Sequence, residues 1–96
     1  MNRELATFVG TYLHFERVYD AGDSLRPTLL GFSESFVAGV REGFAEVLRE
    51  CSMTLGEYER LTEIEFPDDD SLYAYLEDMN AYLFEGREEQ PAPPEE

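Results

Sequence analysis

Apolar residues recur along this chain at the three- and four-residue spacing that places them on one face of an α-helix. The spacing predicts a first helix that begins after Asn2 as N-cap and ends between Phe15 and Tyr19. Its inward face comprises Leu5, Phe8, Val9, Tyr12 and Leu13. Turn-forming residues follow at 20–24. They separate the first helix from a short second one, which carries Pro27 in its first turn, where a missing N–H group costs nothing.

Two further apolar faces belong to the second helix and to a longer third helix. The apolar side of the second consists of Leu25, Leu29, Leu30 and Phe32, with Gly31 and Ser33 ending it. The third begins at Ser33 or Ser35 and continues with Phe36, Val37, Val40, Phe44, Val47 and Leu48 on one face. Gly39 and Gly43 lie four residues apart, hence on the same side of that helix. This pair favours a close helix crossing over a hinge or a partner contact.

The second half of the chain predicts two more helices joined by an acidic turn. Thr54 and Glu57 have the spacing of a capping box at the start of the fourth helix, and Pro67 is expected to stop it. The fifth helix is expected to begin with Asp70 or Ser71 as its cap. Its apolar stripe is Leu72, Tyr75, Leu76, Met79 and Leu83.

These patterns predict an all-α fold, a compact bundle of about five helices. Residues 63–66 are the best strand candidate, but their length and the following proline argue against a strand. Gly86 has the position of a helix C-cap glycine. The helical domain is therefore expected to span residues 1–86, and the proline-rich acidic residues 87–96 are expected to form a disordered tail.

The charge is strongly negative and unevenly distributed. The formal net charge is -15; residues 57–96 carry 14 acidic residues against two Arg, and residues 1–56 carry eight against five Arg. Such a charge repels a nucleic-acid backbone and an anionic membrane, so neither is an expected partner. It favours a basic protein partner and accelerates encounter with it.

The remaining composition narrows the class of protein. Cys51 is the single cysteine, so no internal disulfide forms, and we expect a cytoplasmic protein because no signal-peptide or membrane-spanning pattern is present. All seven basic residues are Arg, which suggests a GC-rich bacterial or phage genome. No motif for catalysis, a cofactor or a metal is recognisable. A reactive pair of His14 with Cys51 has no support in the sequence, and the protein is not expected to be an enzyme.

The candidate partner-binding surface is the acidic turn with the flank of the fifth helix. It comprises Asp68, Asp69, Asp70, Tyr73, Glu77 and Phe84. The three aspartates lack the alternate oxygen spacing and the glycine of a helix-loop-helix calcium loop. They have two other interpretations, a solvated helix start or a contact for a partner. Tyr and Phe beside them would anchor such a partner, since aromatic residues are enriched at interface centres, although packing against the first helix is the alternative.

The sequence also resembles a known family. Residues 5–14, LATFVGTYLH, are similar to the opening of small all-helical immunity proteins of contact-dependent growth inhibition systems. An acidic turn, a capped helix, an aromatic–proline–acidic turn and a closing helix follow in the same order, over roughly residues 3–84. The family usually has an acidic residue and Trp after the His, whereas this chain has Phe15, Glu16 and Arg17 and no Trp.

The resemblance implies a cytoplasmic protein that binds and neutralises one toxin domain, commonly a nuclease. His14 is the one residue that the resemblance adds to the partner-binding candidates, and Glu16, close to it in the sequence, is a further candidate. The alternative function is a nucleic-acid mimic that inhibits a DNA- or RNA-binding protein. A neighbouring gene for a large secreted protein with a toxic C-terminal domain would favour the first function.

Overall fold

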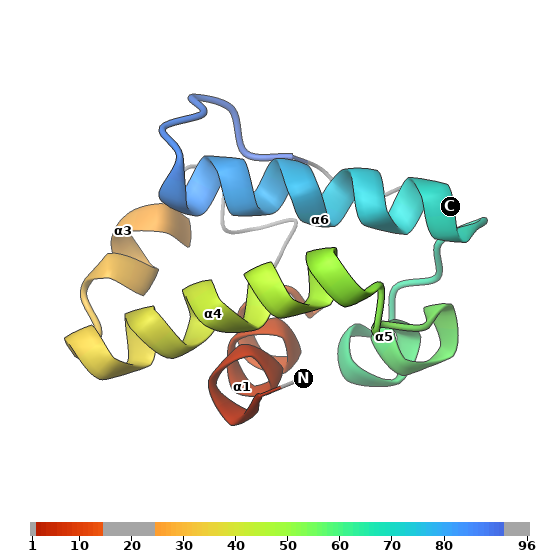
Figure 1. Ribbon diagram of the computed structural model, residues 1–96, viewed down its shortest axis with the longest axis horizontal. Helices are drawn as coiled ribbons and strands as arrows, with labels where there is room; N and C mark the ends of the chain where they lie inside the picture. The colour runs from red at the N-terminus through yellow and green to blue at the C-terminus, as the bar shows by residue number, and fades with distance from the viewer. Residues whose placement is uncertain (1, 15–24, 92–96) are drawn as a thin grey trace.

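The computed structural model describes residues 2–14 and 25–91, which form five α-helices and no strand (Figure 1). The helices are α1 (Arg3–Tyr12), α3 (Leu25–Leu30), α4 (Glu34–Glu50), α5 (Leu55–Thr62) and α6 (Asp69–Phe84). The predicted all-α class is confirmed. Each predicted amphipathic segment forms a helix, because its apolar face can be buried against the others.

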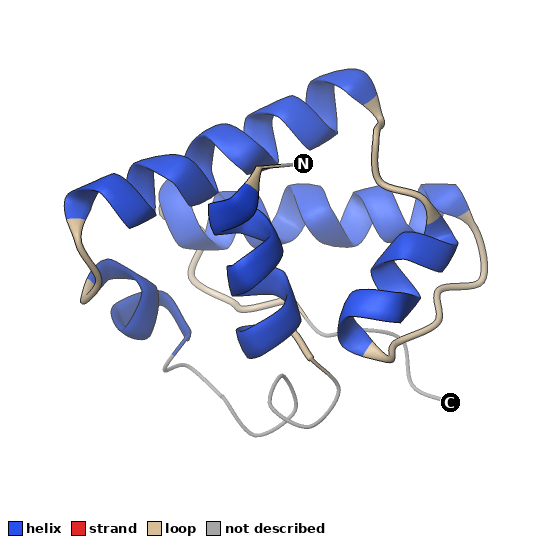
Figure 2. Ribbon diagram, turned by 90° about the horizontal axis from the view of Figure 1, so that it is seen from below, coloured by secondary structure: helices blue, strands red, loops and turns tan. Residues whose placement is uncertain are grey.

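The two long helices, α4 and α6, lie side by side and run in opposite directions (Figure 1). Helix α1 crosses α4 on the side away from α6, as the view from below shows (Figure 2). Helices α3 and α5 lie at opposite ends of this arrangement (Figure 1). One hydrophobic core joins all five helices. Its largest fully buried side chains are Tyr58, Tyr82, Phe8 and Phe44.

Helices α1 and α4 cross closely because α4 presents two glycines at the crossing. A Cβ atom built on Gly39 would lie 2.5 Å from the Glu4 side chain, and one on Gly43 would lie 2.6 Å from the Cβ of Leu5. Real Cβ atoms do not approach this closely, so only glycine fits without moving α1. The predicted close crossing is confirmed.

Side chains cap the starts of α1, α4, α5 and α6, and the sequence indicates three of these caps, beginning with Asn2, which accepts a hydrogen bond from Leu5 N–H. Ser33 caps α4 by accepting from Phe36 N–H, and Thr54 caps α5 by accepting from Glu57 N–H. The predicted cap of α6, Asp70 or Ser71, is wrong: Asp68 is the N-cap. The Asp68 carboxylate reaches the third N–H group of the helix, which only a cap residue placed before the first turn can do.

Helix α1 ends earlier than predicted. It ends at Tyr12, and Leu13 closes the last turn by donating its N–H to the carbonyl oxygen of Val9. The Leu13 side chain is fully buried. The chain therefore leaves the helix where this leucine enters the core, whereas the predicted end lies outside the described residues.

Helix α5 ends at Thr62, five residues before Pro67, the proline that was expected to stop it. The buried Thr62 hydroxyl donates to Tyr58 C=O and accepts from Ile64 N–H, and Glu63 takes a left-handed conformation with φ 60°. The chain then continues without regular secondary structure to Phe66, with Ile64 and Phe66 buried and Glu65 exposed. Residues 63–66, the best strand candidate, thus form part of the connection between α5 and α6.

The first residues of the predicted tail have defined contacts with α6. Gly86 has φ 84° at the helix end, as expected of a C-cap glycine. Arg87 forms an ion pair with Asp78 at 2.7 Å, and its carbonyl oxygen accepts a hydrogen bond from Arg26 of α3. Residues 92–96 lie outside the described part of the chain, and so does the predicted disorder there.

Candidate functional site

The three aspartates of the acidic turn have two different roles, one in capping α6 and one in presenting charge to solvent. The Asp68 carboxylate accepts a hydrogen bond from Ser71 N–H at 2.8 Å, and this bond lowers the pKa of Asp68 because it stabilises the ionised form. Asp68 therefore serves the start of α6. Asp69 and Asp70 occupy the first turn with exposed side chains. Their charge is favoured there by the helix dipole and remains accessible to a partner.

Tyr73 lies one turn further along α6 and is half-buried. Its hydroxyl donates to Met53 C=O and accepts from Met53 N–H, both at 2.8 Å. Burial raises the pKa of the Tyr73 hydroxyl, against the lowering effect of the bond with Met53, and the negative charges of Asp69 and Glu57 add to the rise. Tyr73 thus ties α6 to the connection between α4 and α5, and its ring is the part left for a partner.

A cavity of about 540 Å³ lies next to Tyr73, between the starts of α5 and α6. Asp69 and Asp70 line one side, and Leu55 and Gly56 line the other. A Cβ atom added at Gly56 would meet no atom within 4 Å, so the rim is open at this residue. The cavity combines apolar walls with two exposed carboxylates, a combination that suits the aliphatic stem and cationic head of Lys or Arg. We call it the acidic pocket.

Phe84 does not belong to the acidic pocket, although the sequence placed it on the same flank of α6. It follows Tyr73 by eleven residues, a rise of about 16 Å along the helix. Its half-buried ring packs edge-on against Phe44 at 6.3 Å, and the Arg41 guanidinium lies 5.0 Å from it. Glu77, between the two, is exposed. The structure therefore brings Asp69, Asp70 and Tyr73 together and leaves Phe84 at the other end of α6.

His14 contacts α5 at the end of that helix. Its Nε2 atom lies 2.7 Å from a carboxylate oxygen of Glu63, and its side chain is 23% exposed. This contact joins the chain after α1 to the left-handed residue that ends α5. Glu16, the candidate beside it, lies outside the described residues.

The sequence did not predict that two large hydrophobic side chains at the end of α3 would be exposed. Leu30 and Phe32 were placed on the apolar side of the second helix, yet they are 52% and 39% exposed. A helix of six residues buries Leu25 and Leu29, which are four apart, whereas Leu30 lies about 100° away around the axis. That spacing is the signal that separates the exposed leucine from the buried pair.

Among residues 2–14 and 25–91, no three or more His, Cys, Asp or Glu side chains are grouped so that they could hold a metal ion. None of the described helices is both long and apolar enough to cross a membrane. Comparisons of the chain with protein-family models, with curated proteins and with solved structures found no match. The surface chemistry of the described residues is therefore what indicates a function.

Proposed function

We propose that this protein is an acidic binding module that neutralises a basic protein partner, a toxin domain such as a nuclease, by covering it. The observation that carries the proposal is the acidic pocket, where two exposed carboxylates, Asp69 and Asp70, stand beside the half-buried ring of Tyr73. This proposal places the action in the cytoplasm and requires no bond-making chemistry.

The acidic pocket fits a cationic side chain of the partner. The Tyr73 ring and Leu55 would cover the aliphatic stem, and the two aspartates would pair with the charged head. Hydrogen bonds between ionised groups are stronger than neutral ones, most of all for a guanidinium that bonds two oxygens. Nuclease active sites carry basic residues that hold phosphate, so an acidic surface that occupies them prevents substrate binding.

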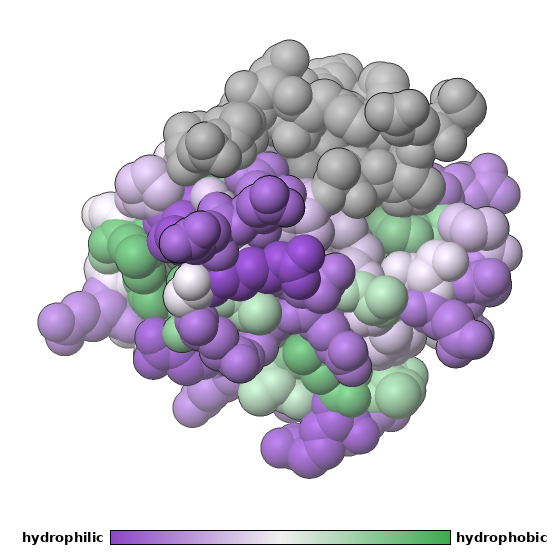
Figure 3. Space-filling model, turned by 90° about the horizontal axis from the view of Figure 1, so that it is seen from above, coloured by the Kyte–Doolittle hydropathy of each residue, from purple (hydrophilic) through white to green (hydrophobic). Residues whose placement is uncertain are grey.

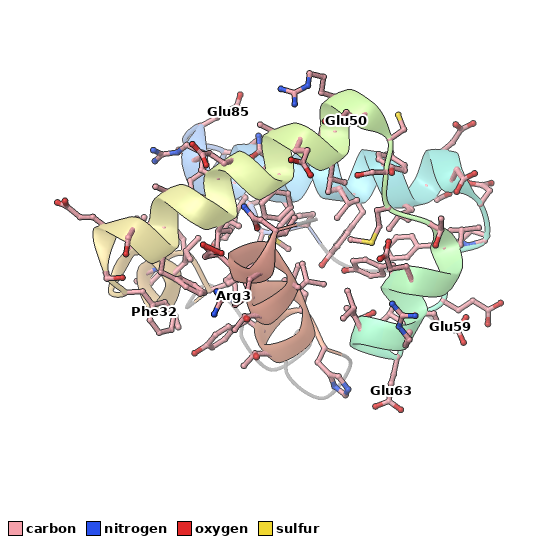
Figure 4. All side chains as sticks on the ribbon, turned by 60° about the horizontal axis from the view of Figure 1, so that its bottom comes forward. Arg3, Phe32, Glu50, Glu59, Glu63 and Glu85 are labelled. Carbon is pink, nitrogen blue, oxygen red and sulfur yellow. The ribbon has the colours of Figure 1, made fainter. Side chains whose placement is uncertain are left out.

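The overall charge supports fast recognition of such a partner. Residues 57–70, which hold most of α5, the connection to α6 and the first residues of α6, carry seven acidic residues against one Arg. Figure 4 places Glu59 and Glu63 on α5 and Phe32 at the opposite end of the molecule. A basic partner is therefore steered toward the end that holds the acidic pocket, and steering of this kind raises the association rate more than the affinity.

The test is a titration of a candidate toxin domain, the C-terminal domain of a large secreted protein whose gene adjoins the gene of this protein. We expect its activity to fall linearly with added protein and to vanish at one equivalent, as stoichiometric neutralisation requires. Activity that persists at several equivalents would contradict the proposal.

The same titration distinguishes the nucleic-acid-mimic alternative. A mimic would be displaced by an excess of unrelated duplex DNA of any sequence, because both compete through phosphate-like charge. Neutralisation that resists this competitor at physiological salt supports specific recognition of the toxin domain.

A further inference from the structure

An exposed apolar groove lies where α3 meets α4. Leu30 and Phe32 are the large hydrophobic side chains that remain exposed among the described residues. They border a cavity of about 430 Å³ together with Val37 and Ala38. Figure 3 shows hydrophobic surface at the end of the molecule where Figure 1 places α3 and the start of α4. Contiguous exposed apolar surface on a small protein marks a contact site.

Phe32 is held in place beside this groove by neighbouring rings. Its ring centre lies 5.0 Å from that of Phe36 and 5.8 Å from that of Tyr12. Ring pairs at such separations are favourable, so Phe32 is a fixed projection rather than a freely rotating side chain. The same end of the molecule therefore presents both a projecting ring and a hollow with apolar walls.

The charges that line the groove are balanced. Glu34 and Arg41 lie on α4, seven residues or two turns apart, and they contribute one negative and one positive charge. A basic partner attracted by net charge is steered to the acidic pocket at the other end of α6 instead. A second copy of the chain suits this groove, because a two-fold axis that passes between Glu34 and Arg41 places each residue opposite the oppositely charged residue of the other copy.

We propose that the groove is a self-association surface, in which Phe32 of each copy enters the groove of the other. The two-fold axis then pairs Glu34 of one copy with Arg41 of the other, twice. Repulsion between the acidic ends is screened, since the Debye length is about 8 Å at physiological salt. The inference does not rest on the proposed function, because the acidic pocket lies at the other end of α6 and stays accessible in the dimer.

Sedimentation equilibrium of the full chain tests the apolar part of the surface. The natural protein should pass from monomer to dimer between about 1 µM and 1 mM, the range of weak protein–protein contacts. Phe32→Ser should raise the dimer dissociation constant at least ten-fold. Ala45→Ser, a matched change at an exposed position of α4, should leave it unchanged.

The charged pair gives a second test that does not disturb the aromatic contacts of Phe32. Glu34→Arg and Arg41→Glu should each weaken self-association, because each places like charges opposite one another. An equimolar mixture of the two variants should form a heterodimer at least as tight as the natural dimer, since both pairs are then restored across the axis.

Three results would overturn the proposal. The first is that the natural protein stays monomeric up to about 1 mM. The second is that the Phe32→Ser variant, folded by circular dichroism, has the same dimer dissociation constant as the natural protein. The third is that the mixture of the two charge variants associates no better than either variant alone. None of these concerns toxin binding, so they leave the proposed function unaffected.

Discussion

At the scale of single residues, the structure separates folding from binding within a few positions. Asp68 caps α6, whereas Asp69 and Asp70 point their charge outward. Tyr73 combines both roles, because its hydroxyl binds the backbone of Met53 while its ring faces the acidic pocket. The sequence identified the aspartates and the ring as neighbours on one helix. It could not reveal the bond to Met53, which depends on how the connection between α4 and α5 folds back.

Tyr73→Phe separates these two roles. The substitution keeps the ring but removes the partner of the buried Met53 N–H and C=O groups. We expect the free energy of unfolding to fall by about 1–3 kcal/mol, the cost of leaving such groups unsatisfied. Urea denaturation measures this loss, and affinity for the toxin domain should stay within about two-fold of the natural protein. Unchanged stability would show that the hydroxyl does not hold Met53.

At the scale of helices, patterns of three or four residues predicted more than single breaking residues did. Apart from the exposed Leu30 and Phe32, the apolar stripes lie where the sequence placed them, and so do the caps Asn2, Ser33 and Thr54. Pro67 did not mark the end of α5, because the Thr62 hydroxyl and the left-handed Glu63 end the helix first. A proline sets the latest point at which a helix can stop. The earlier stop depends on burial of Thr62 in the assembled core, which local sequence does not show.

The close crossing of α1 and α4 can be tested by comparing two glycines, one with no room for a Cβ atom and one with open space around it. Gly43→Ala would bring a Cβ atom within 2.6 Å of Leu5 and should destabilise the protein by about 1–3 kcal/mol through overpacking. Gly56→Ala is the matched control in α5, where a Cβ meets nothing within 4 Å. It should stabilise by up to about 1 kcal/mol, because alanine favours helix over glycine. Thermal unfolding that ranks the two variants in the reverse order would contradict the close crossing.

At the scale of the whole molecule, the acidic pocket and the exposed apolar groove occupy different ends. The acidic pocket lies where α5 and α6 begin, and the exposed Phe32 lies at the other end of the bundle (Figure 4). The sequence predicted the charge asymmetry directly, since it follows from composition along the chain. It did not predict the pocket, because one wall comes from α5 and the other from α6. The proposed toxin contact and the proposed dimer contact can therefore coexist.

The central claim is that the acidic pocket receives the basic partner, and association kinetics with the toxin domain test it most directly. Stopped-flow measurements should show that Asp69→Asn with Asp70→Asn lowers the association rate constant about ten-fold at low salt and flattens its salt dependence. Glu42→Gln with Glu50→Gln removes the same charge from exposed positions of α4 and should change the rate far less. Equal effects of the two double variants, both folded by circular dichroism, would show that net charge alone guides binding and would contradict a site at Asp69 and Asp70.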